Sequence, residues 1–369
     1  MSSTIPSQQK ALFLLSKQGD WKVDHTPVLK PKAGEVLIRV ESSALNPVDW
    51  KVRDWGLDVI PEYPTILGCD SAGVVIAVGE GVKSVAIGDK VIHQGEFDVR
   101  KGSFQQYNLE LSHLVAKLPP NLTFDQGATI STAAATAAIS FYGPKVDLGG
   151  LALTPPWTNG GRGKYAGTPL LIIGGASSVG QAVIQFAQLS GFSPIVTTAS
   201  LSGADRLKSL GATHVIDRYA DLPSSLQVIT ATPFSLIYDA ISSPETKETA
   251  HSILAEGGTL IIVEQPGVKE AVPTKEVIAP WAGVNQSPNK EIGAELMANL
   301  SALLENGDIK VSILLCLLDC TRNSYAVGDK PNMVEVIPNG LAGIPDGLDR
   351  LRKYQVIAKK LVVHPQETL

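Results

Sequence analysis

Residues Leu170 to Phe192, LLIIGGASSVGQAVIQFAQLSGF, join a short apolar run to a glycine-rich turn and a stretch with helical spacing. The apolar run does not alternate with polar residues, which is typical of a parallel strand buried on both faces. After the turn, apolar residues recur along one helix face, at Val179, Ala182, Val183, Phe186 and Ala187. Gly191 follows at a position where a helix can end. The stretch therefore predicts a strand–turn–helix unit of the kind that binds nucleotides.

The turn of this unit, Gly175-Ala176-Ser177-Ser178-Val179-Gly180, matches the dinucleotide fingerprint G-x-G-x-x-G incompletely, because Ser177 stands in the place of the middle glycine. A serine leaves less room for a pyrophosphate but adds a hydroxyl that can bond a phosphate oxygen. The helix N-terminus supplies an anion site in either case. We predict that these six residues bind the cofactor; the alternative is a turn that only packs strand against helix.

Composition limits the kinds of protein to consider. The chain has 369 residues, 44% of them hydrophobic, which allows a large core and two domains. Its net charge of -5, without basic blocks, argues against nucleic acid or an anionic membrane as partner. No apolar run reaches the roughly 18 residues of a membrane helix, and the N-terminus lacks a signal-peptide pattern, so we expect a cytoplasmic protein. Three cysteines cannot form a disulfide framework. From the charge we expect a small molecule as the partner.

The order of segments predicts two domains. Up to about residue 121, short β-like runs are separated by glycine, proline and acidic turns. Residues 123–143 are alanine-rich and helical, and residues 144–169 form a glycine- and proline-punctuated insertion, interpreted as a surface loop or a lid. From Leu170 onward strand-like and helix-like segments alternate, which predicts a doubly wound parallel sheet. We assign residues 1–125, completed by 308–369, to a β-rich domain and residues 126–307 to the nucleotide-binding domain.

Further motifs extend over nearly the whole chain. They are Asn46-Pro47-Val48-Asp49-Trp50-Lys51, Gly68-Cys69-Asp70-Ser71-Ala72-Gly73, Val78-Gly79, Gly88-Asp89-Lys90-Val91, GGASSVG, SLGATHVID and the terminal KKLVV. With the alanine-rich helix, they resemble the medium-chain dehydrogenase/reductases. The resemblance implies an α/β fold in which a GroES-like, β-rich catalytic domain precedes a doubly wound Rossmann domain that binds NADP. The chain looks most similar to the zinc-free branch of quinone oxidoreductases and, more closely, trans-acting enoyl reductases of polyketide assembly.

Metal ligands are missing from the sequence in the patterns that zinc requires. A catalytic zinc takes three protein ligands, and a structural zinc in such enzymes takes four closely spaced cysteines. In the zinc-dependent relatives a cysteine stands where this chain has Asn46, and Gly-His-Glu stands where it has Gly68-Cys69-Asp70. Cys69 is interpreted as a small buried hydrophobe. We therefore expect no metal in the reaction.

The reaction expected without a metal is a conjugate reduction, because carbonyl reduction develops alkoxide charge that zinc usually stabilises. Hydride delivered to the β-carbon of an enone or enoyl thioester leaves a delocalised enolate that a hydrogen-bond donor can support. The predicted function is zinc-independent, NADPH-dependent reduction of an activated C=C bond in a small molecule, including a carrier-bound thioester. The alternatives are an NADPH quinone reductase and a cofactor-binding protein with little turnover. Both monomer and homodimer remain open.

Lys51 and Asn46 are the candidate catalytic residues, because the resemblance places residues 46–51 against the cofactor. The ammonium of Lys51 can bond ribose hydroxyls or an enolate oxygen; the alternative is a solvated surface lysine. Val48 and Asp49 are assigned to cofactor binding, with a helix-capping role as the alternative for Asp49. Thr136 matches a family threonine beside the nicotinamide, and its alternative is a packed helix threonine. Nearby aromatic residues either line a substrate pocket or belong to the core, namely Trp50, Trp55, Tyr107 and Trp281.

NADPH is expected in preference to NADH. About 20 residues after the fingerprint, where NAD enzymes carry an acidic residue, this chain has Ser200. Ser200 and Arg218 match family positions that hold the 2′-phosphate, although relatives commonly carry a tyrosine where Arg218 stands. Arg206 and Lys208 are weaker candidates or plain helix-surface charges. The resemblance also assigns Glu264 and Ala358 to cofactor binding.

Residues 311–330, VSILLCLLDCTRNSYAVGDK, interrupt a passage that matches the family without them. The segment holds Cys316 and Cys320 and an apolar cluster without alternation. We interpret it as a retained intron that is read in frame. A genuine insertion and a metal site at the two cysteines are the alternatives.

Overall fold

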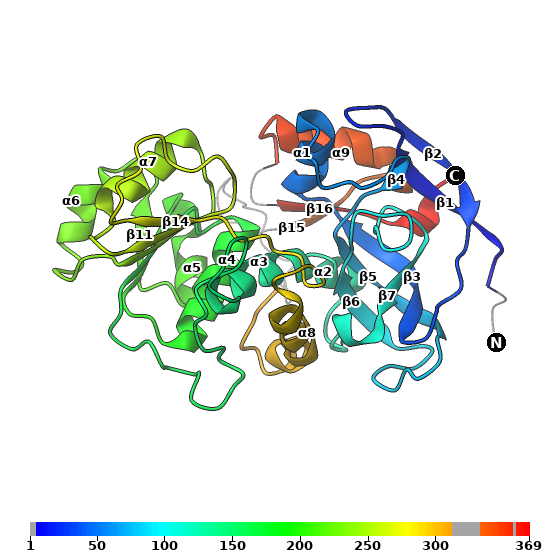
Figure 1. The fold of residues 1–369 in the computed structure, drawn as a ribbon, viewed down its shortest axis with the longest axis horizontal. Helices are drawn as coiled ribbons and strands as arrows, with labels where there is room; N and C mark the ends of the chain where they lie inside the picture. The colour runs from blue at the N-terminus through cyan, green and yellow to red at the C-terminus, as the bar shows by residue number, and fades with distance from the viewer. Residues whose placement is uncertain (1–4, 312–332, 357–358) are drawn as a thin grey trace, which may run out of the picture. The chain divides into compact units, whose positions relative to one another are not determined.

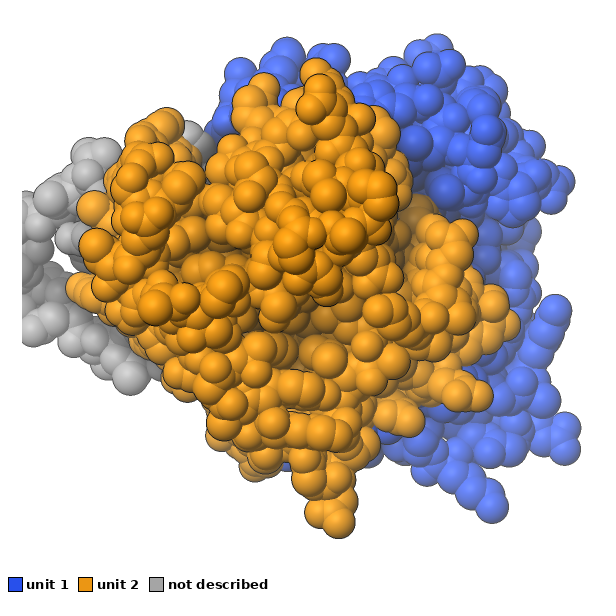
Figure 2. Space-filling model, turned by 60° about the vertical axis from the view of Figure 1, so that its left-hand side comes forward, with its two compact units in different colours: residues 1–132, 297–305, 332–369 blue, residues 133–296, 306–331 orange. Residues whose placement is uncertain are grey.

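The computed structural model describes residues 5–311, 333–356 and 359–369. It divides into two compact units, which Figure 2 colours separately. Unit 1 comprises Met1–Thr132, Met297–Glu305 and Asn332–Leu369, and unit 2 comprises Ala133–Leu296 and Asn306–Pro331. Ala358 and all but the first residue of the interpreted intron, residues 311–330, lie outside the described residues.

Unit 1 is built on two β-sheets (Figure 1). The smaller has the order β2-β1-β4, formed by Trp21–Pro27, Gln8–Leu14 and Thr65–Ile66. The larger has the order β15-β16-β3-β5-β6-β8, formed by Met333–Val336, Lys359–Val363, Glu35–Ala44, Asp70–Val78, Lys90–Gln94 and Val115–Lys117, with β7 (Tyr107–Leu111) paired to β3. The helical segments of unit 1 are α1 (Pro47–Trp55), α2 (Phe124–Gly127), α9 (Ile344–Arg352), η1 (Ser112–Leu114), η3 (Gly340–Gly343) and η4 (Pro365–Glu367).

The C-terminal strand β16 returns to the sheet of the N-terminal part of the chain. β16 pairs antiparallel with β3, with Val362 opposite Ala44, so the C-terminal segment completes the sheet that the N-terminal part begins. Its apolar residues Leu361, Val362 and Val363 are fully buried. The β-rich character of the first domain is therefore also correct.

Unit 2 contains a parallel sheet with the order β11-β10-β9-β12-β13-β14. Its strands are β9 (Leu170–Ile173), β10 (Ile195–Ala199), β11 (His214–Asp217), β12 (Leu236–Asp239), β13 (Thr259–Ile262) and β14 (Glu276–Ile278). The helical segments are α4 (Ser178–Ser190), α5 (Ala204–Ser209), α6 (Leu222–Gln227), α7 (Pro244–Ile253) and η2 (Leu201–Gly203). Two more helices, α3 (Ser131–Tyr142) and α8 (Lys290–Glu305), cross from one unit to the other. The doubly wound parallel sheet predicted from the alternating segments is thereby confirmed.

The strand order makes β9 the turning point of the sheet. The chain proceeds from β9 to β10 and β11 on one side, then returns to β12 on the other side of β9. In open α/β sheets, ligands bind outside the carboxyl ends of the strands at such a switch point. The glycine-rich turn after β9 therefore lies at the place where a nucleotide is expected.

The units do not divide where composition changes. The predicted boundary follows residue 125, whereas unit 1 extends to Thr132 and also takes in Met297–Glu305. Thr132 belongs to unit 1 because its backbone N–H donates to Asp70 and its hydroxyl to the carbonyl of Cys69. Ser301 likewise donates to the carbonyl of Lys117. The alanine-rich composition marks where helices begin, and side-chain contacts decide to which unit they belong.

The insertion at residues 144–169 contains no helix or strand, and it packs against other parts of unit 2, to which it belongs. The Tyr165 ring stacks on Phe192 with centroids 5.2 Å apart, and Trp157 meets Tyr142 edge-on at 5.3 Å. Arg162 forms an ion pair with Asp308. These anchors favour the surface-loop interpretation over a lid.

None of the helices in the described ranges combines the length and apolar character needed to cross a membrane.

Candidate functional site

Helix α1 carries most of the predicted catalytic segment. Asn46 is its N-cap residue, Pro47 is its first residue, and Gly56 ends it in the left-handed conformation with φ 62°. The carboxylate of Asp49 accepts a hydrogen bond from the backbone N–H of Asn46 at 2.8 Å. Asp49 therefore has the capping role that the sequence left open, and Lys51 follows it on the helix.

The start of α1 is tied to two other elements through the Asn46 amide. Nδ2 of Asn46 donates to Asp70 at 2.9 Å and to the sulfur of Cys69 at 3.4 Å. Lys360, on β16, donates to Oδ1 of Asn46, and its ammonium lies 3.3 Å from the Asp70 carboxylate. We call Asn46, Asp49, Cys69, Asp70 and Lys360 the α1 cluster.

Burial sets the protonation chemistry of the α1 cluster. Asp49 and Asp70 are completely buried. Desolvation raises the pKa of Asp49 to about 7, although the hydrogen bond from Asn46 and the charge of Lys360 act in the opposite direction. Desolvation also raises the pKa of the Cys69 thiol well above its usual value. The cluster thus contains a carboxyl group that titrates near neutral pH and a thiol that stays neutral, as expected for a buried hydrophobic cysteine.

Lys51 is half-buried against aromatic rings. Its ammonium lies 5.1 Å from the ring centroid of Trp55 and 5.7 Å from that of Trp50. The two indoles meet edge-on with centroids 5.3 Å apart. Cation–π attraction of this kind limits where the ammonium can point. Lys51 is therefore held in a restricted direction, in contrast to the freely solvated lysine of the alternative interpretation.

The predicted cofactor turn joins β9 to α4. Ser177 is the N-cap of α4, and its hydroxyl accepts a hydrogen bond from the backbone N–H of Gly180 at 3.0 Å. A Cβ atom on Gly175 would lie 2.0 Å from the hydroxyl of Thr197, and one on Gly180 would lie 2.3 Å from the carbonyl of Gly174. The two retained glycines are thus required by packing. Ser177 has φ -69°, which any residue adopts, so serine can replace the middle glycine without backbone strain.

The first turn of α4 provides an anion site. The N–H groups that open a helix lack intrahelical acceptors, and those of Ser178 and Val179 belong to this set. Ala176 is exposed, and Ser177, Ser178 and Val179 are partly exposed. The turn therefore has the backbone donors that a pyrophosphate requires.

The two residues predicted to hold a 2′-phosphate come together at adjacent strand ends. Ala199, at the end of β10, pairs with Asp217, at the end of β11, so Ser200 and Arg218 follow at the same edge. The backbone N–H of Arg218 donates to the carbonyl of Ala199 at 3.0 Å. Ser200 is exposed, and the Arg218 guanidinium lies 4.8 Å from the ring centroid of Tyr219.

Arg206 is not a fully solvated charge on the helix surface, which was one interpretation of this residue. It is partly buried and donates to the side-chain oxygen of Gln181 at 2.9 Å. Gln181 in turn donates to the carbonyl of Ala176 at 2.9 Å. Arg206 therefore braces the cofactor turn from α5, while Lys208 is exposed.

The remaining predicted cofactor residues lie on other elements of unit 2. Thr136 is half-buried in α3 among buried alanines. Glu264 follows β13, and its backbone carbonyl accepts a hydrogen bond from the almost fully buried Lys247 at 3.4 Å. Lys247 also bonds the carbonyl of Pro266, so it fixes the loop after β13. Sequence reasoning missed Lys247 because an α7 lysine carries no sign that it turns inward.

Lys360 was also missed, although it lies in the quoted KKLVV motif. In a strand, successive side chains point to opposite faces. The exposed Lys359 therefore pairs with Glu335 at 2.9 Å, whereas Lys360 points into the α1 cluster. Strand alternation predicts that the two lysines face opposite sides of the sheet, but it does not predict which side carries the acids.

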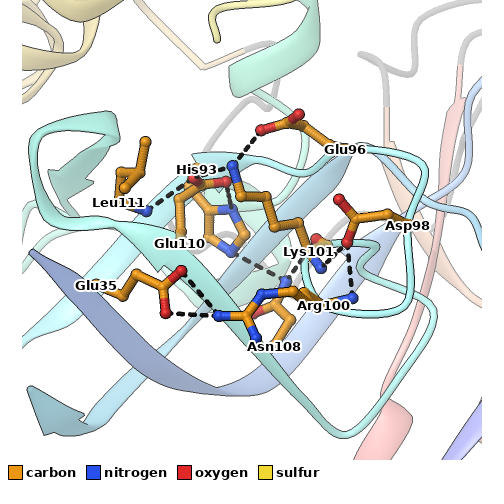
Figure 3. A network of polar contacts seen from close by, with 9 residues as sticks. All are labelled: Glu35, His93, Glu96, Asp98, Arg100, Lys101, Asn108, Glu110 and Leu111. Atoms are coloured by element: carbon orange, nitrogen blue, oxygen red, sulfur yellow. Dashed lines mark hydrogen bonds and ion pairs between the residues drawn. The ribbon is translucent and has the colours of Figure 1, made fainter. Parts of the chain in front are cut away.

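A second buried charged group, shown in Figure 3, lies within unit 1 and escaped the sequence analysis. We call His93, Glu96, Lys101, Asn108 and Glu110 the barrel cluster. Lys101 pairs with Glu96 and lies 3.4 Å from Glu110, and Nδ1 of His93 lies 3.8 Å from Glu110. Burial raises the pKa of Glu110 to about 8 and lowers that of His93 to about 4. Both groups are therefore largely neutral at pH 7.

Comparison with known proteins identifies both parts of the chain. Residues 32–120 match the alcohol dehydrogenase GroES-like domain, and residues 178–284 match the family described as zinc-binding dehydrogenase. The chain is 30% identical to the trans-enoyl reductase himH of Aspergillus japonicus, over 89% of each protein.

Solved structures share the fold at low sequence identity. A quinone oxidoreductase of Pseudomonas syringae pv. Tomato superposes with a TM-score of 0.71 at 18% identity, covering 97% of this chain and 100% of the other. A mycobacterial protein solved in complex with NADPH has a TM-score of 0.71 at 20% identity, with the same coverage.

The matched relative and both domain models agree with the GroES-like and Rossmann architecture of the two units. The chain is therefore a member of the medium-chain dehydrogenase/reductase superfamily, an oxidoreductase with a Rossmann domain for a nicotinamide cofactor.

Proposed function

We propose that this protein is a zinc-independent, NADPH-dependent reductase of activated C=C bonds in enones or enoyl thioesters, free or carrier-bound. The observation that carries the proposal is the α1 cluster, in which a lysine ammonium lies against Asn46 and Asp70. These are positions where the resemblance places zinc ligands in the metal-dependent enzymes. The similarity to a trans-enoyl reductase supports the same reaction.

The side chains of the α1 cluster do not fit a zinc ion. Cys69 keeps its proton because burial raises its pKa, and Asn46 offers an amide oxygen that already accepts from Lys360. The ammonium of Lys360 lies 3.3 Å from the Asp70 carboxylate, so it would repel a metal cation bound to that carboxylate. The described residues include no group of His, Cys, Asp or Glu that could hold a metal ion. The family name that mentions zinc attaches to residues 178–284, which exclude the α1 cluster.

The protein's part in the reaction is to orient and to stabilise charge. NADPH supplies the hydride for the β-carbon of the acceptor. The ammonium of Lys51, held on two indoles, is the donor we assign to the enolate oxygen or to ribose hydroxyls. Asn46 holds the start of α1 through its amide and Asp49 caps that helix. Val48 and Thr136 are assigned to the nicotinamide side of the cofactor.

For the phosphate side of the cofactor we assign Gly175, Ala176, Ser177, Ser178, Val179 and Gly180 to the pyrophosphate and Ser200 with Arg218 to the 2′-phosphate. The end of β10 carries a serine and no carboxylate, which favours NADPH over NADH. The NADPH complex of the mycobacterial neighbour is consistent with this choice. Arg218→Ala should reduce the ratio of NADPH to NADH affinity about tenfold, a loss of one charge-assisted phosphate contact. An unchanged ratio would remove Arg218 from the site.

An acceptor screen tests the function. Purified protein would be mixed with NADPH and a panel of enones, enoyl N-acetylcysteamine thioesters and quinones, and NADPH oxidation followed by absorbance. We expect the enoyl compounds to be reduced and the rate to survive treatment with a metal chelator. Preference for quinones would favour the alternative of a quinone reductase. NADPH binding without turnover would favour a cofactor-binding protein.

Elemental analysis of the active protein provides the second test. We expect substoichiometric zinc with full activity. One zinc per active chain would contradict the proposal.

A further inference from the structure

Lys360 is the only member of the α1 cluster contributed by the C-terminal strand β16. Its side chain is 11% exposed, and Asp70, its ion-pair partner, is 0% exposed. Taking a lysine ammonium out of water is costly unless it is paired and hydrogen-bonded. Lys360 has both kinds of partner, since it also donates to Oδ1 of Asn46.

The orientation of the Asn46 amide follows from the chemistry of its two neighbours. An ammonium can only donate, so the amide must present its oxygen to Lys360. A carboxylate can only accept, so the amide must present its NH₂ to Asp70. The amide is thus locked between opposite charges, and each neighbour enforces the same orientation.

Asn46 also connects the contacts with Lys360 and Asp70 to helix α1. It is the N-cap residue, and its backbone N–H bonds Asp49 in the first turn. Asp70 is held in addition by the backbone N–H of Thr132 at 2.7 Å. A cation on β16 therefore acts on the first turn of the helix that carries Lys51.

We propose that Lys360 is a positioning residue for the reaction: by bonding Asn46 and Asp70 together, its ammonium fixes the first turn of α1 and thereby the direction in which Lys51 leaves the helix. This inference rests on the proposed function for its catalytic consequence. The structural part of the inference, that Lys360 fixes the first turn of α1, concerns the unliganded protein alone.

The charge of Lys360 also acts on Asp49. Burial raises the pKa of Asp49 to about 7 and the neighbouring Asp70 raises it as well, while Lys360 lowers it. Removing the ammonium takes away the cation of the cluster and leaves both buried acids. Asp49 should then hold its proton to a higher pH.

The test compares Lys360→Met with Lys360→Arg and with the control Lys359→Met. Lys359 is the next residue on β16, faces the other way and pairs with Glu335, outside the α1 cluster. The cofactor-free proteins would carry ¹³C-labelled aspartate, and the carboxyl signals would be followed against pH, with Asp49→Asn for assignment. We expect the midpoint of Asp49 to rise by about one pH unit in Lys360→Met, because this buried acid loses the cation that lowers its pKa. Lys359→Met should match the wild type.

Hydrogen exchange of backbone amides provides a second readout without turnover. Exchange at residues 46–51 should become at least about tenfold faster in Lys360→Met and stay near the wild-type rate in Lys360→Arg. If Lys360→Met does not fold, Lys360→Gln replaces it, since glutamine can still donate to Asn46 but carries no charge. Unchanged titration and unchanged exchange in the uncharged variant would overturn the proposal.

Kinetic measurements then test whether the contacts of Lys360 with Asn46 and Asp70 affect the reaction. With an enone acceptor, Lys360→Met should lower kcat/KM about tenfold, and Lys360→Arg should restore most of it. The pH at which the rate falls should move with the NMR midpoint. If no acceptor is reduced by the wild type, the proposed function fails, and titration and exchange still decide whether Lys360 positions α1. If the wild type turns over and the uncharged variant keeps its rate and pH profile, the positioning role fails.

Discussion

Unit 1 contains two buried charged groups that are alike in composition and different in position. The α1 cluster sets Lys360 among Asp70 and Asp49, and the barrel cluster sets Lys101 among Glu110 and Glu96. In the α1 cluster the acids are completely buried. In the barrel cluster Glu110 is completely buried as well, and the two lysines are almost equally exposed, at 11% for Lys360 and 12% for Lys101. The difference lies in Glu96, whose side chain is 23% exposed, so that Lys101 has a second, partly hydrated partner.

The two clusters also differ in what they hold together. The barrel cluster joins residues of β6, β7 and the loop between them, and these strands are already fixed by pairing with β5 and β3 (Figure 3). The α1 cluster joins the start of β16, the start of β5 and the first turn of α1. Only the second arrangement sets the direction of an element that leaves the sheet. A buried charge pair can therefore serve positioning in one place and stability in the other.

Removing one acid from each cluster should produce the largest difference. Asp70→Ala leaves the ammonium of Lys360 without its ion-pair partner and should lower the free energy of unfolding by about 3 kcal/mol. Glu110→Ala leaves Lys101 paired with the more exposed Glu96 and should cost about 1 kcal/mol. Urea unfolding followed by tryptophan fluorescence measures both. Equal losses would mean that the difference in burial has no energetic consequence.

Removing a lysine near each cluster should separate catalysis from stability. Lys51→Ala should lower turnover of an enone more than tenfold, about 1.4 kcal/mol of transition-state stabilisation, because α1 presents this ammonium. Lys101→Met should leave kcat/KM close to the wild-type value once corrected for the folded fraction. Steady-state kinetics on matched preparations decide the matter. Wild-type rates in Lys51→Ala would return that residue to the surface-charge interpretation.

The smallest expected effect is a difference in pH dependence. The pKa of Glu110 is about 8 in the folded protein, above its ordinary value of 4.5, so its contribution to stability is present at low pH and is lost as pH rises through about 8. Glu110→Gln should therefore become progressively more stable relative to the wild type as the pH rises from 5 to 8. His93, with a lowered pKa, changes stability in the opposite direction and at more acidic pH.

Asp49→Asn provides the matched variant in the α1 cluster. The pKa of Asp49 is also raised, but to about 7, so its gain relative to the wild type should appear at lower pH than that of Glu110→Gln. Thermal unfolding across pH 5 to 9 would resolve the two windows. A gain for either variant that decreases with rising pH would contradict the assigned directions.

Local patterns were sufficient where neighbouring residues decide the structure. The run Leu170–Ile173 without alternation predicted a buried parallel strand, and the spacing after the turn predicted α4. The same patterns predicted the turn between β9 and α4, where Ser177 replaces the middle glycine without strain because its φ suits any residue. Capping of α1 by Asp49 was also foreseen as one of two roles.

Patterns failed where partners come from distant parts of the chain. Lys360 bonds Asn46, and Thr132 bonds Asp70, across separations that no local period records. The units defined by contacts follow the same rule: the contacts of Thr132 place the start of α3 in unit 1, whereas the predicted boundary follows residue 125. Arg206 was interpreted as a weaker phosphate candidate or a helix-surface charge. Its hydrogen bond to Gln181 was not predicted, because Gln181 lies on another helix.

By itself, the amino-acid sequence determined the elements, the order of the two folds and the family to which the chain belongs, because hydrophobic period, glycine placement and caps act within a few residues. Tertiary structure alone decided which charges are buried and which groups they meet. Lys359 and Lys360 differ by one position in a strand, yet one lies in solvent beside Glu335 and the other lies in the α1 cluster. The physical reason is that the pKa and orientation of a charged group depend on its surroundings, and packing of distant segments creates those surroundings.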